Sequence, residues 1–354
     1  VAMSGGVDSS VAAALLKKQG YDVSGMFMRL WFDHTIDPKS QNRCCPREAE
    51  ELARHVAEQL DIPFRIVNAR IPFKKAVVDY FLKELRSGRT PNPCVPCNKL
   101  IRFDYLLKQA KARGAGFLAT GHYVQLKRDK KGITVHCGSD PSKDQSYFLY
   151  NLTQSKLKHV LFPLGDIKKA QVRKIARKLN IASADQPESQ DICFIPRGKY
   201  FEFLSKYLKL KTGLIVSENG KDLGQHKGLP LYTIGQREGL GIGGSGPFYV
   251  ARKDSKKNRL IVSRKGSKEL LVKKFRVKNI NFISGKSPKM PFKCQIQIRY
   301  RQKAIQATLC RSGKNIIVNL LKPERAITPG QSAVFYNKKK LIGGGVINNF
   351  TIHN

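Results

Sequence analysis

Acidic residues are scarce in this 354-residue sequence: 26 Asp and Glu stand against 65 Lys and Arg, a formal net charge of +39. The imbalance is largest in residues 201–354, which hold 31 basic and 7 acidic residues. Scattered lysines on a solvated surface would explain part of this excess. An excess of this size outside a tail nevertheless favours a polyanionic partner, and nucleic acid is the first expectation.

Long apolar runs are lacking as well. None approaches the roughly 18 residues of a membrane-spanning helix, so no membrane association is expected. The eight cysteines are dispersed and no signal peptide is visible, which favours reduced intracellular thiols over structural disulfides. Because the sequence opens inside a strand-like run, "VAM", we expect further residues upstream. The bacterial cytosol is the default compartment, with an organelle left open.

The first 190 residues alternate strand patterns with amphipathic helical patterns. Helical patterns cover residues 9–20, 46–60, 73–88 and 103–114, and strand patterns cover residues 22–31, 64–69 and 117–124. Such alternation predicts an α/β fold, a doubly wound parallel sheet with its ligand site at the carboxyl ends of the strands.

The pattern changes at about residue 200. One more helical segment, 199–208, is followed by short apolar runs such as 228–234, separated by Gly, Pro, Asn and Lys. This texture is typical of small antiparallel β domains. We place domain boundaries near 195–205 and 265–272.

A glycine-rich turn follows the first strand. "SGGVDSS" (residues 4–10) opens a helix, so that backbone N–H groups and the positive helix end converge on an anion. Gly5 and Gly6 permit close approach of a phosphate, and Ser4, Ser9 and Ser10 can add hydroxyl donors. The lysine of a Walker A loop is absent. An ordinary strand–turn–helix corner is the less favoured interpretation.

A second glycine cluster, "GIGGSG" (residues 241–246), matches the letters of a dinucleotide-binding motif. Pro247 and the strand-like "FYVA" follow it, where that motif requires a helix. We interpret it as a flexible loop.

The stretch "PNPCVPCNK" places Cys94 and Cys97 at Cys-x-x-Cys spacing. That spacing suits half a zinc site, a redox disulfide, part of an iron–sulfur site, or one nucleophile beside an unrelated thiol. A zinc site would need a second pair of ligands at finger spacing, and none is present. The local sequence leaves the other interpretations open.

The remaining cysteines divide into three kinds. Adjacent Cys44 and Cys45 diverge too much to share one ion easily, and they receive no role. Three others sit in strand-like runs and are expected in the core: Cys137, Cys294 and Cys310. Cys193, in "ESQDICFIP" at the domain boundary, is either an active-site residue in a loop over the sheet or an ordinary buried cysteine.

Ten motifs then occur in the order found in the tRNA-specific 2-thiouridylases, from the first residue to about 350. They are "SGGVDSS", "RCCP", "GRTPNPCVPCNKLIRF", "ATGHY", "KDQSYFLY", "LFPLG", "SQDICFIP", "YTIGQREGLGI", "RYRQ" and "PGQSAVFY". The sequence closely resembles this family of ATP-using PP-loop enzymes, which put sulfur on the wobble uridine of lysine, glutamate and glutamine tRNAs. The resemblance implies a PP-loop ATP-binding catalytic domain (1–198), a small central β domain (199–268) and a tRNA-binding C-terminal β-barrel (269–354).

The resemblance also implies roles for individual residues. Cys97 matches the nucleophile and Cys193 the persulfide carrier, with a transient disulfide between them. Residues at the positions of the family's ATP contacts are Ala2, Met3, Ser4, Gly5, Gly6, Val7, Asp8, Ser9, Met28 and Gly121. Asn92, Pro93 and Cys94 fall where the target base is held. Residues at tRNA contacts are His122, Lys143, Asp144, Gln145, Arg299, Tyr300 and Gln331.

The implied reaction uses ATP, with Mg²⁺ expected, to adenylate O2 of the uridine before a Cys193 persulfide attacks C2. A persulfide is acidic and strongly nucleophilic, which suits an attack at neutral pH. The base must leave its stem-loop to reach the site, so an extended grip on the RNA is required. A sulfur-relay protein or a cysteine desulfurase is the expected donor, and the enzyme is expected to be a monomer.

One position departs from the family pattern, because many members carry Asp where this sequence has Cys94. The substitution puts the proton-transfer role of that Asp in doubt. It also opens an alternative in which Cys94, Cys97 and Cys193 hold three irons of a [4Fe–4S] cluster whose fourth iron binds the sulfide.

Two rival interpretations of the whole chain stand beside this one. Another AMP-forming PP-loop enzyme acting on tRNA or a small molecule would have no need for thiols at 97 and 193. A non-catalytic RNA-binding protein would have no need for "SGGVDSS" at a strand end.

Overall fold

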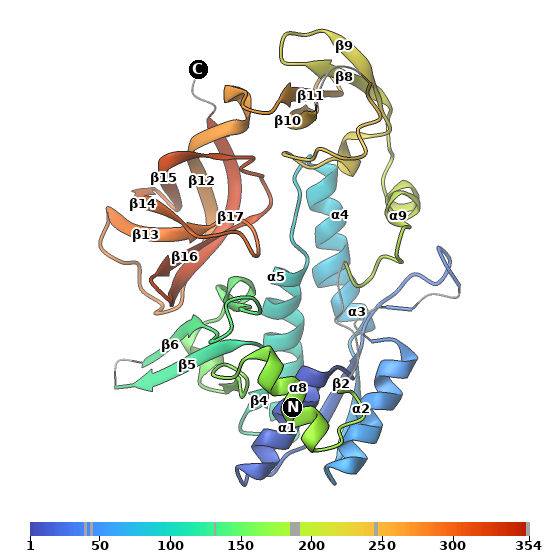
Figure 1. The fold of residues 1–354 in the computed structure, drawn as a ribbon, viewed down its shortest axis with the longest axis vertical. Helices are drawn as coiled ribbons and strands as arrows, with labels where there is room; N and C mark the ends of the chain where they lie inside the picture. The colour runs from blue at the N-terminus through green and yellow to red at the C-terminus, as the bar shows by residue number, and fades with distance from the viewer. Residues whose placement is uncertain (39–40, 43–44, 131, 185–191, 244–246, 352–354) are drawn as a thin grey trace.

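The computed structural model describes the chain except residues 39–40, 43–44, 131, 185–191, 244–246 and 352–354. An α/β unit lies at the bottom of Figure 1, a small β unit at the top, and a β-barrel beside them at the left. In the described part of the chain, no helix is long and apolar enough to cross a membrane.

The N-terminal unit is built on short parallel strands. Strands β1 (Ala2–Met3), β2 (Gly25–Arg29) and β3 (Phe64–Asn68) pair in parallel, with Ala2 opposite Met26 and Gly25 opposite Phe64. A second parallel pair consists of β4 (Leu118–Ala119) and β7 (Val160–Leu161). Helices α1 (Val7–Lys18), α2 (Arg47–Gln59) and α8 (Lys169–Lys178) surround the strands. The predicted α/β class is confirmed.

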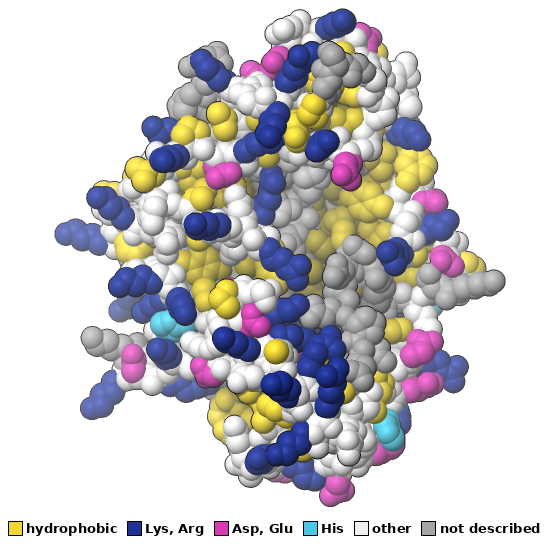
Figure 2. Space-filling model, viewed as in Figure 1, with side chains coloured by type: hydrophobic (Ala, Val, Ile, Leu, Met, Phe, Trp, Pro, Cys, Tyr) yellow, Lys and Arg dark blue, Asp and Glu magenta, His cyan; other side chains and the backbone are white. Residues whose placement is uncertain are grey.

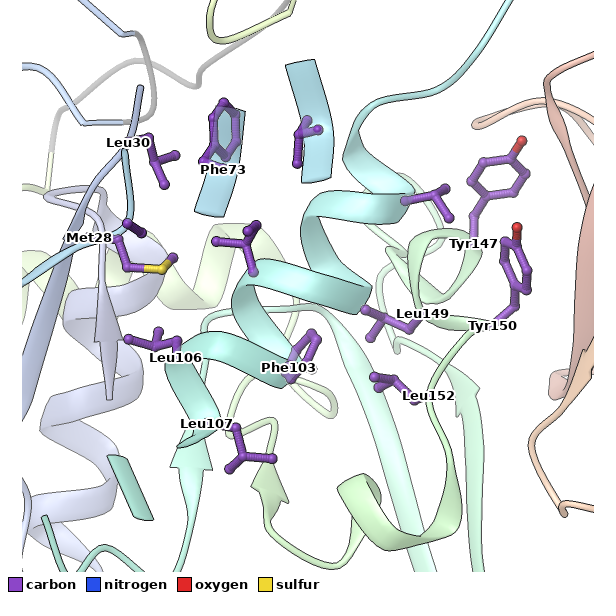
Figure 3. Close-up of a cluster of buried hydrophobic side chains, with 14 of the residues drawn as sticks. Met28, Leu30, Phe73, Phe103, Leu106, Leu107, Tyr147, Leu149, Tyr150 and Leu152 are labelled. Atoms are coloured by element: carbon purple, nitrogen blue, oxygen red, sulfur yellow. The ribbon is translucent and has the colours of Figure 1, made fainter. Parts of the chain in front are cut away.

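Two helical columns pack against this sheet. The first runs through α3 (Arg70–Phe73), η1 (Lys74–Val78) and α4 (Asp79–Arg86), near the predicted helix at 73–88. The second runs through α5 (Cys94–Pro96), η2 (Cys97–Leu106) and α6 (Leu107–Lys111). Figure 3 shows Phe103, Leu106 and Leu107 of the second column between Met28 and Leu30 on one side and Tyr147–Leu152 on the other.

The second column begins nine residues before the predicted start at 103. Pro93 and Pro96 made the segment look like a loop, yet proline is tolerated in the first turn of a helix, where its missing N–H has no partner to lose. The helix widens over Cys97–Leu106 and Phe103 leaves helical geometry, with φ −99° and ψ 15°. The expected strand at 117–124 is correspondingly short, because only Leu118–Ala119 pair with β7.

A β-hairpin, β5 (Val124–Asp129) and β6 (Gly132–Cys137), follows β4. Its strand β6 pairs with β17 of the barrel, His136 opposite Lys340 and Val135 opposite Leu341. One sheet therefore runs from the N-terminal unit into the barrel. The segment after the hairpin contains η3 (Ser146–Leu149) and α7 (Gln154–Leu157), and Tyr147 donates to the Ser332 carbonyl of the barrel.

The central unit follows α9 (Tyr200–Tyr207), a helix predicted at 199–208. Its sheet has the order β10 (Phe248–Asp254), β11 (Arg259–Arg264), β8 (Gly213–Ser217) and β9 (Asp222–His226). The β11–β8 pair is parallel, unlike the antiparallel pairing expected. The apolar run 228–234 forms the short helix η4 (Leu229–Leu231) rather than a strand, with Pro230 in its first turn.

The C-terminal unit is a closed barrel, as predicted. After η5 (Lys268–Leu270) its strands are β12 (Leu271–Phe282), β13 (Phe292–Gln297), β14 (Ile305–Ser312), β15 (Asn315–Arg325), β16 (Ser332–Asn337) and β17 (Lys340–Thr351). They pair in the order β12–β15–β14–β13–β16–β17, and β17 returns to β12. Phe275, Val318 and Phe335 fill the interior.

Candidate active site

The turn between β1 and α1 is shaped for an anion. Gly5 has φ +73°, and a Cβ there would lie 2.3 Å from the Ala49 carbonyl oxygen at the start of α2, so only glycine fits. The Ser9 hydroxyl accepts from the Ser4 amide at 3.1 Å and donates to the Gly6 carbonyl at 3.0 Å. The loop is thereby held at the N-terminus of α1, where backbone N–H groups favour phosphate.

Ser4, Ser9 and Ser10 were all expected to donate hydroxyl groups to a phosphate, but in the structure they differ in role. Ser9 and Ser10 are buried, and both hydroxyls donate to the Gly6 carbonyl, at 3.0 and 3.1 Å. Ser10 also accepts from Ser183 at 3.0 Å. Ser4 is the exposed member of the set. The inner two hydroxyls therefore stabilise the loop, which leaves Ser4 as the serine open to a ligand.

Asp8 of the loop is held by two residues that the sequence did not point to. The Lys169 ammonium and the Tyr123 hydroxyl each lie 2.6 Å from Asp8 Oδ1, and Lys169 is buried. Lys169 is the first residue of α8, directly after Lys168. Cations are disfavoured at a helix N-terminus, so two adjacent lysines there were the available signal that one has an acidic partner elsewhere.

The end of β4 connects this loop to the second helical column. A Cβ on Gly121, two residues after β4, would lie 2.8 Å from the Asp8 carbonyl carbon and the Ser9 nitrogen, so the turn after β4 lies directly against the start of α1. The next residue, His122, is buried with its Nδ1 2.7 Å from the Thr120 hydroxyl, and its ring lies 5.7 Å from that of Phe103 in η2. Burial, with the nearby Arg102 charge, holds the pKa of His122 well below its ordinary value. This imidazole is therefore neutral at physiological pH.

The segment carrying the paired cysteines is a turn that leads into a helix. Asn92 Oδ1 accepts from the Cys94 amide at 3.0 Å, and the Cys97 amide donates to the Pro93 carbonyl at 3.2 Å. Asn98 donates to the Cys94 carbonyl at 3.0 Å. Cys94 is exposed and Cys97 is partly buried. The turn thus presents Cys94 outward and draws Cys97 toward the apolar core.

Cys193 packs against the same apolar core as Cys97. Its neighbour Phe194 is fully buried, with ring centroids 5.9 Å from Phe73 and 5.5 Å from Phe81. Phe73 belongs to α3, which packs on η2. The two cysteines therefore flank one core, while residues 185–191, just before Cys193, lie outside the described chain.

No preformed iron–sulfur site is found among the residues that the structure describes. Among the residues that the structure describes, no group of three or more His, Cys, Asp or Glu side chains is placed to hold a metal ion. Cys94, Cys97 and Cys193 are all described and form no such group. We therefore derive no chemical step through a cluster.

Comparison with known proteins decides the family. Residues 1–197, 201–264 and 272–347 match the models described as tRNA methyl transferase HUP domain, tRNA methyl transferase PRC-barrel domain and aminomethyltransferase β-barrel domain. A tRNA-specific 2-thiouridylase MnmA of Magnetococcus marinus is 45% identical over 354 residues, 98% of each chain. One from Clostridium acetobutylicum is 43% identical over 350 residues, also 98% of each chain. The chain belongs to the tRNA-specific 2-thiouridylase family.

Three solved structures that resemble this thiouridylase-family chain are 18–20% identical to it. The U34-tRNA thiolase NcsA from Methanococcus maripaludis, with its [4Fe–4S] cluster, is 20% identical and has a TM-score of 0.34. The match covers 54% of this chain and 59% of that one. A likeness at this level supports no inference about chemistry.

The other described cysteines of this thiouridylase-family chain are buried or partly buried. Cys294 is buried in β13, and burial raises the pKa of its thiol to about 12. Cys137 is partly buried, with a pKa raised by burial to about 11. Cys310 is partly buried and accepts from Asn319 at 3.4 Å. The Cys45 sulfur accepts from the Leu30 amide at 3.1 Å, and Cys44 lies outside the described residues.

The residues matched to the family's tRNA contacts are mostly engaged inside the molecule. Asp144 accepts from the Gly138 amide at 2.9 Å and the Ser146 hydroxyl at 2.7 Å. Gln145 Oε1 accepts from the Tyr123 amide at 3.1 Å. Lys143 is partly buried, and its amide donates to the Asp140 carbonyl. These contacts stabilise the loop beside the phosphate-binding turn.

The barrel residues of that set are engaged in the same way. Arg299 donates to the Ala326 carbonyl, and burial lowers its pKa. The Tyr300 ring lies 4.4 Å from that of Phe148 in η3. Gln331 donates to the Thr90 carbonyl at 2.8 Å. Met28, matched to an ATP contact, has its side chain in the core (Figure 3).

Basic side chains cover much of the molecule around this site. Figure 2 shows Lys and Arg spread over the viewed face, outnumbering Asp and Glu, and crowded near α8.

A pocket of about 340 Å³ lies in the central unit, lined by Arg237, Leu240, Ile242 and Phe248 around the "GIGGSG" loop. Residues 244–246 of that loop are not described, and the helix of a dinucleotide motif is replaced by strand β10, which begins at Phe248.

Proposed function

We propose that this chain is an ATP-dependent tRNA-uridine 2-sulfurtransferase. It replaces O2 of the wobble uridine in lysine, glutamate and glutamine tRNAs with sulfur and releases AMP and pyrophosphate. The observation that carries the proposal is the meeting of two elements at the end of β4. Gly121 abuts the phosphate-type loop at Asp8–Ser9, and His122 contacts Phe103 of the helix that carries Cys97.

This meeting matches the chemical problem. The uridine C2 carbonyl is a poor electrophile, and its oxygen is a worse leaving group. Attack of O2 on the α-phosphorus of ATP expels pyrophosphate and leaves O2 as part of an AMP leaving group. The phosphate loop must then lie beside the base, as the Gly121 contact allows. The N–H groups at the start of α1 hold the phosphates, Mg²⁺ accompanies the ATP, and Lys169 keeps Asp8 in place.

Sulfur transfer follows in two steps. The terminal sulfur of a Cys193 persulfide attacks C2 and displaces AMP, giving a Cys193–S–S–C2 adduct. The Cys97 thiolate then attacks the Cys193 sulfur, so that the S–S bond to the RNA sulfur breaks and 2-thiouridine leaves. A Cys97–Cys193 disulfide results, and an external dithiol returns it to two thiols by supplying two electrons.

The base lies against Asn92, Pro93 and Cys94, whose turn is preset by the bond from the Cys94 amide to Asn92. His122 packs against Phe103 of the helix that carries Cys97, and as a neutral imidazole it can donate or accept a hydrogen bond without adding charge. The tRNA is gripped by the basic surface of residues 201–354. The persulfide is loaded by a sulfur-relay protein or a cysteine desulfurase, and the enzyme acts as a monomer in the cytoplasm.

Thiolation of an unmodified lysine tRNA transcript tests the proposal. With ATP and a persulfide donor, the protein should retard the RNA on a mercury-containing gel, and omission of ATP should abolish the shift. Cys193→Ala should give no shift, while Cys310→Ala, a cysteine of the barrel, should behave as the wild type. A shift of wild-type size without ATP, or with Cys193→Ala, would contradict the proposed reaction.

A further inference from the structure

The barrel is hydrogen-bonded to the loop that leads to the paired cysteines Cys94 and Cys97. The Thr90 amide donates to the Pro329 carbonyl at 2.9 Å. The Gln331 side chain donates to the Thr90 carbonyl at 2.8 Å, across 241 residues of sequence. Both backbone polar groups of Thr90 are therefore bonded to one turn of the barrel, Pro329–Gln331, which we call the barrel clamp.

Gly330 allows the clamp to close. It has φ +96°, and a Cβ there would lie 2.9 Å from the backbone N, C and O atoms of Thr90. The clamp is itself fixed, because the Gly330 amide donates to the Ile347 carbonyl at 2.9 Å and the Ile347 amide donates to the Gln331 carbonyl at 2.8 Å. Ile347 belongs to β17, so the clamp is tied to the barrel wall.

The position of Thr90 restricts the positions of Cys94 and Cys97. Pro91, Pro93 and Pro96 fix their φ angles near −65°, so few torsions are free between Thr90 and Cys97. On the other side, Arg89 makes a two-pronged ion pair with Glu84 of α4, both contacts at 2.7 Å. Thr90 thus joins a segment anchored to α4 with a stiff segment that ends at the thiol-bearing helix.

We propose that Gln331 is a positioning residue: through Thr90 it sets the place of the Asn92–Cys97 segment in the RNA-free protein. This goes beyond the resemblance, which matches Gln331 to a tRNA contact. The inference rests on the proposed function in naming Cys97 as the thiol that reacts. The barrel is then part of the active-site framework, and the pairing of β17 with β6 joins it to the N-terminal unit.

RNA-free protein provides the direct test. In Gln331→Ala and Gln331→Glu, hydrogen exchange of the peptide around Thr90 should quicken and alkylation of Cys97 should change about fivefold, the equilibrium factor of one lost hydrogen bond. Gly330→Ala should act in the same direction. Gln306→Ala replaces an exposed glutamine on β14 and should leave both rates unchanged. Thermal unfolding identifies any variant that fails to fold, and Gln331→Glu keeps the size of the side chain.

Kinetics with tRNA separate a positioning role from RNA binding. Gln331→Ala should lower kcat for thiolation while KM for tRNA stays within about twofold, because the tRNA grip is left intact. A raised KM for tRNA with unchanged exchange and alkylation would show that Gln331 binds RNA, and would overturn the inference. Unchanged exchange and alkylation would overturn it too. If the wild type failed to thiolate tRNA, the proposed function would fail while the RNA-free measurements still judged the clamp.

Discussion

The Lys169 ammonium lies 2.6 Å from the Asp8 carboxylate, joining the first residue of α8 to the phosphate-type loop 161 residues earlier. Lys169 is buried, and Tyr123 bonds the same carboxylate oxygen. The Asp8 side chain is 33% exposed, so removing Lys169 leaves a partly solvated carboxylate and costs less than the about 3–5 kcal/mol typical of a fully buried ion pair. The pair therefore stabilises the geometry on which ATP binding depends.

Lys169→Met should raise KM for ATP and lower kcat/KM for adenylation by about 10-fold or more, since about 1.4 kcal/mol corresponds to a factor of ten. Pyrophosphate release in the presence of tRNA measures the effect. Lys174→Met, at an exposed position of the same helix, is the control and should retain wild-type kinetics. Equal activity of the two variants would show that the Asp8 contact does not matter for ATP use.

Gly121→Ala should damage the phosphate loop through contact with backbone rather than with a flexible side chain. Its Cβ would meet Asp8 and Ser9 backbone atoms at 2.8 Å, and overpacking of this kind costs about 1–3 kcal/mol. We expect a lower melting temperature and weaker ATP binding in a thermal-shift titration. Gly116→Ala should change neither, because this glycine is exposed and an added Cβ would meet no other atom within 4 Å. A Gly121→Ala protein as stable as the control would refute the close contact.

Cys97→Ala should separate the two sulfur steps. Attack by the Cys193 persulfide does not need Cys97, so without reductant the variant should trap a protein–RNA adduct that a dithiol dissolves. A denaturing, non-reducing gel with end-labelled tRNA detects the adduct. Cys193→Ala should form no adduct. Burial raises the pKa of the Cys137 thiol to about 11, so this thiol is unreactive and Cys137→Ala should turn over like the wild type. An adduct in Cys193→Ala would assign the persulfide to another cysteine.

Asp33 should make the contact between loop 31–36 and α9 sensitive to acid. Burial alone would raise the pKa of Asp33, but hydrogen bonds from Lys206, Tyr207 and Thr35 outweigh it and lower the pKa to about 2. A depressed carboxyl pKa contributes stability above the unfolded-state pKa of roughly 4, and the contribution is lost as pH falls toward 2. The shift corresponds to about 2 kcal/mol at neutral pH.

Asp33→Asn should therefore be less stable than the wild type by about 2 kcal/mol at pH 7, and the difference should shrink as the pH approaches 2. Trp31, the single tryptophan, lies 6.3 Å from the Tyr207 ring, so its fluorescence reports this contact during urea unfolding. Asp61→Asn, whose side chain is fully exposed, is the control. A stability difference that stays constant with pH would contradict the assigned pKa.

The parts predictable from sequence were local ones. A strand, two glycines and a helix occupy the first 18 residues, so the phosphate-type loop could be placed without knowing the rest of the fold. The α/β class and the closed barrel followed from periodicity and resemblance. The two domain boundaries, the site residues and the Cys97–Cys193 disulfide stay predictions.

The parts that were missed depend on distant contacts. Lys169 looks like one more basic residue until the fold brings it to Asp8. Strand β6 finds its partner in β17, some 200 residues later, and no local pattern specifies that pairing. The helix that carries Cys97 was hidden by its prolines, whose helix-breaking signal does not apply within a first turn.

The central claim is that uridine O2 leaves the RNA as an oxygen of AMP. An anticodon stem-loop with ¹⁸O at O2 of its wobble uridine tests this directly, with the released AMP analysed by mass spectrometry. The account predicts AMP heavier by one ¹⁸O atom, in equal amount to the 2-thiouridine formed. Unlabelled AMP alongside 2-thiouridine would contradict it, because ATP would then have been cleaved without activating the base.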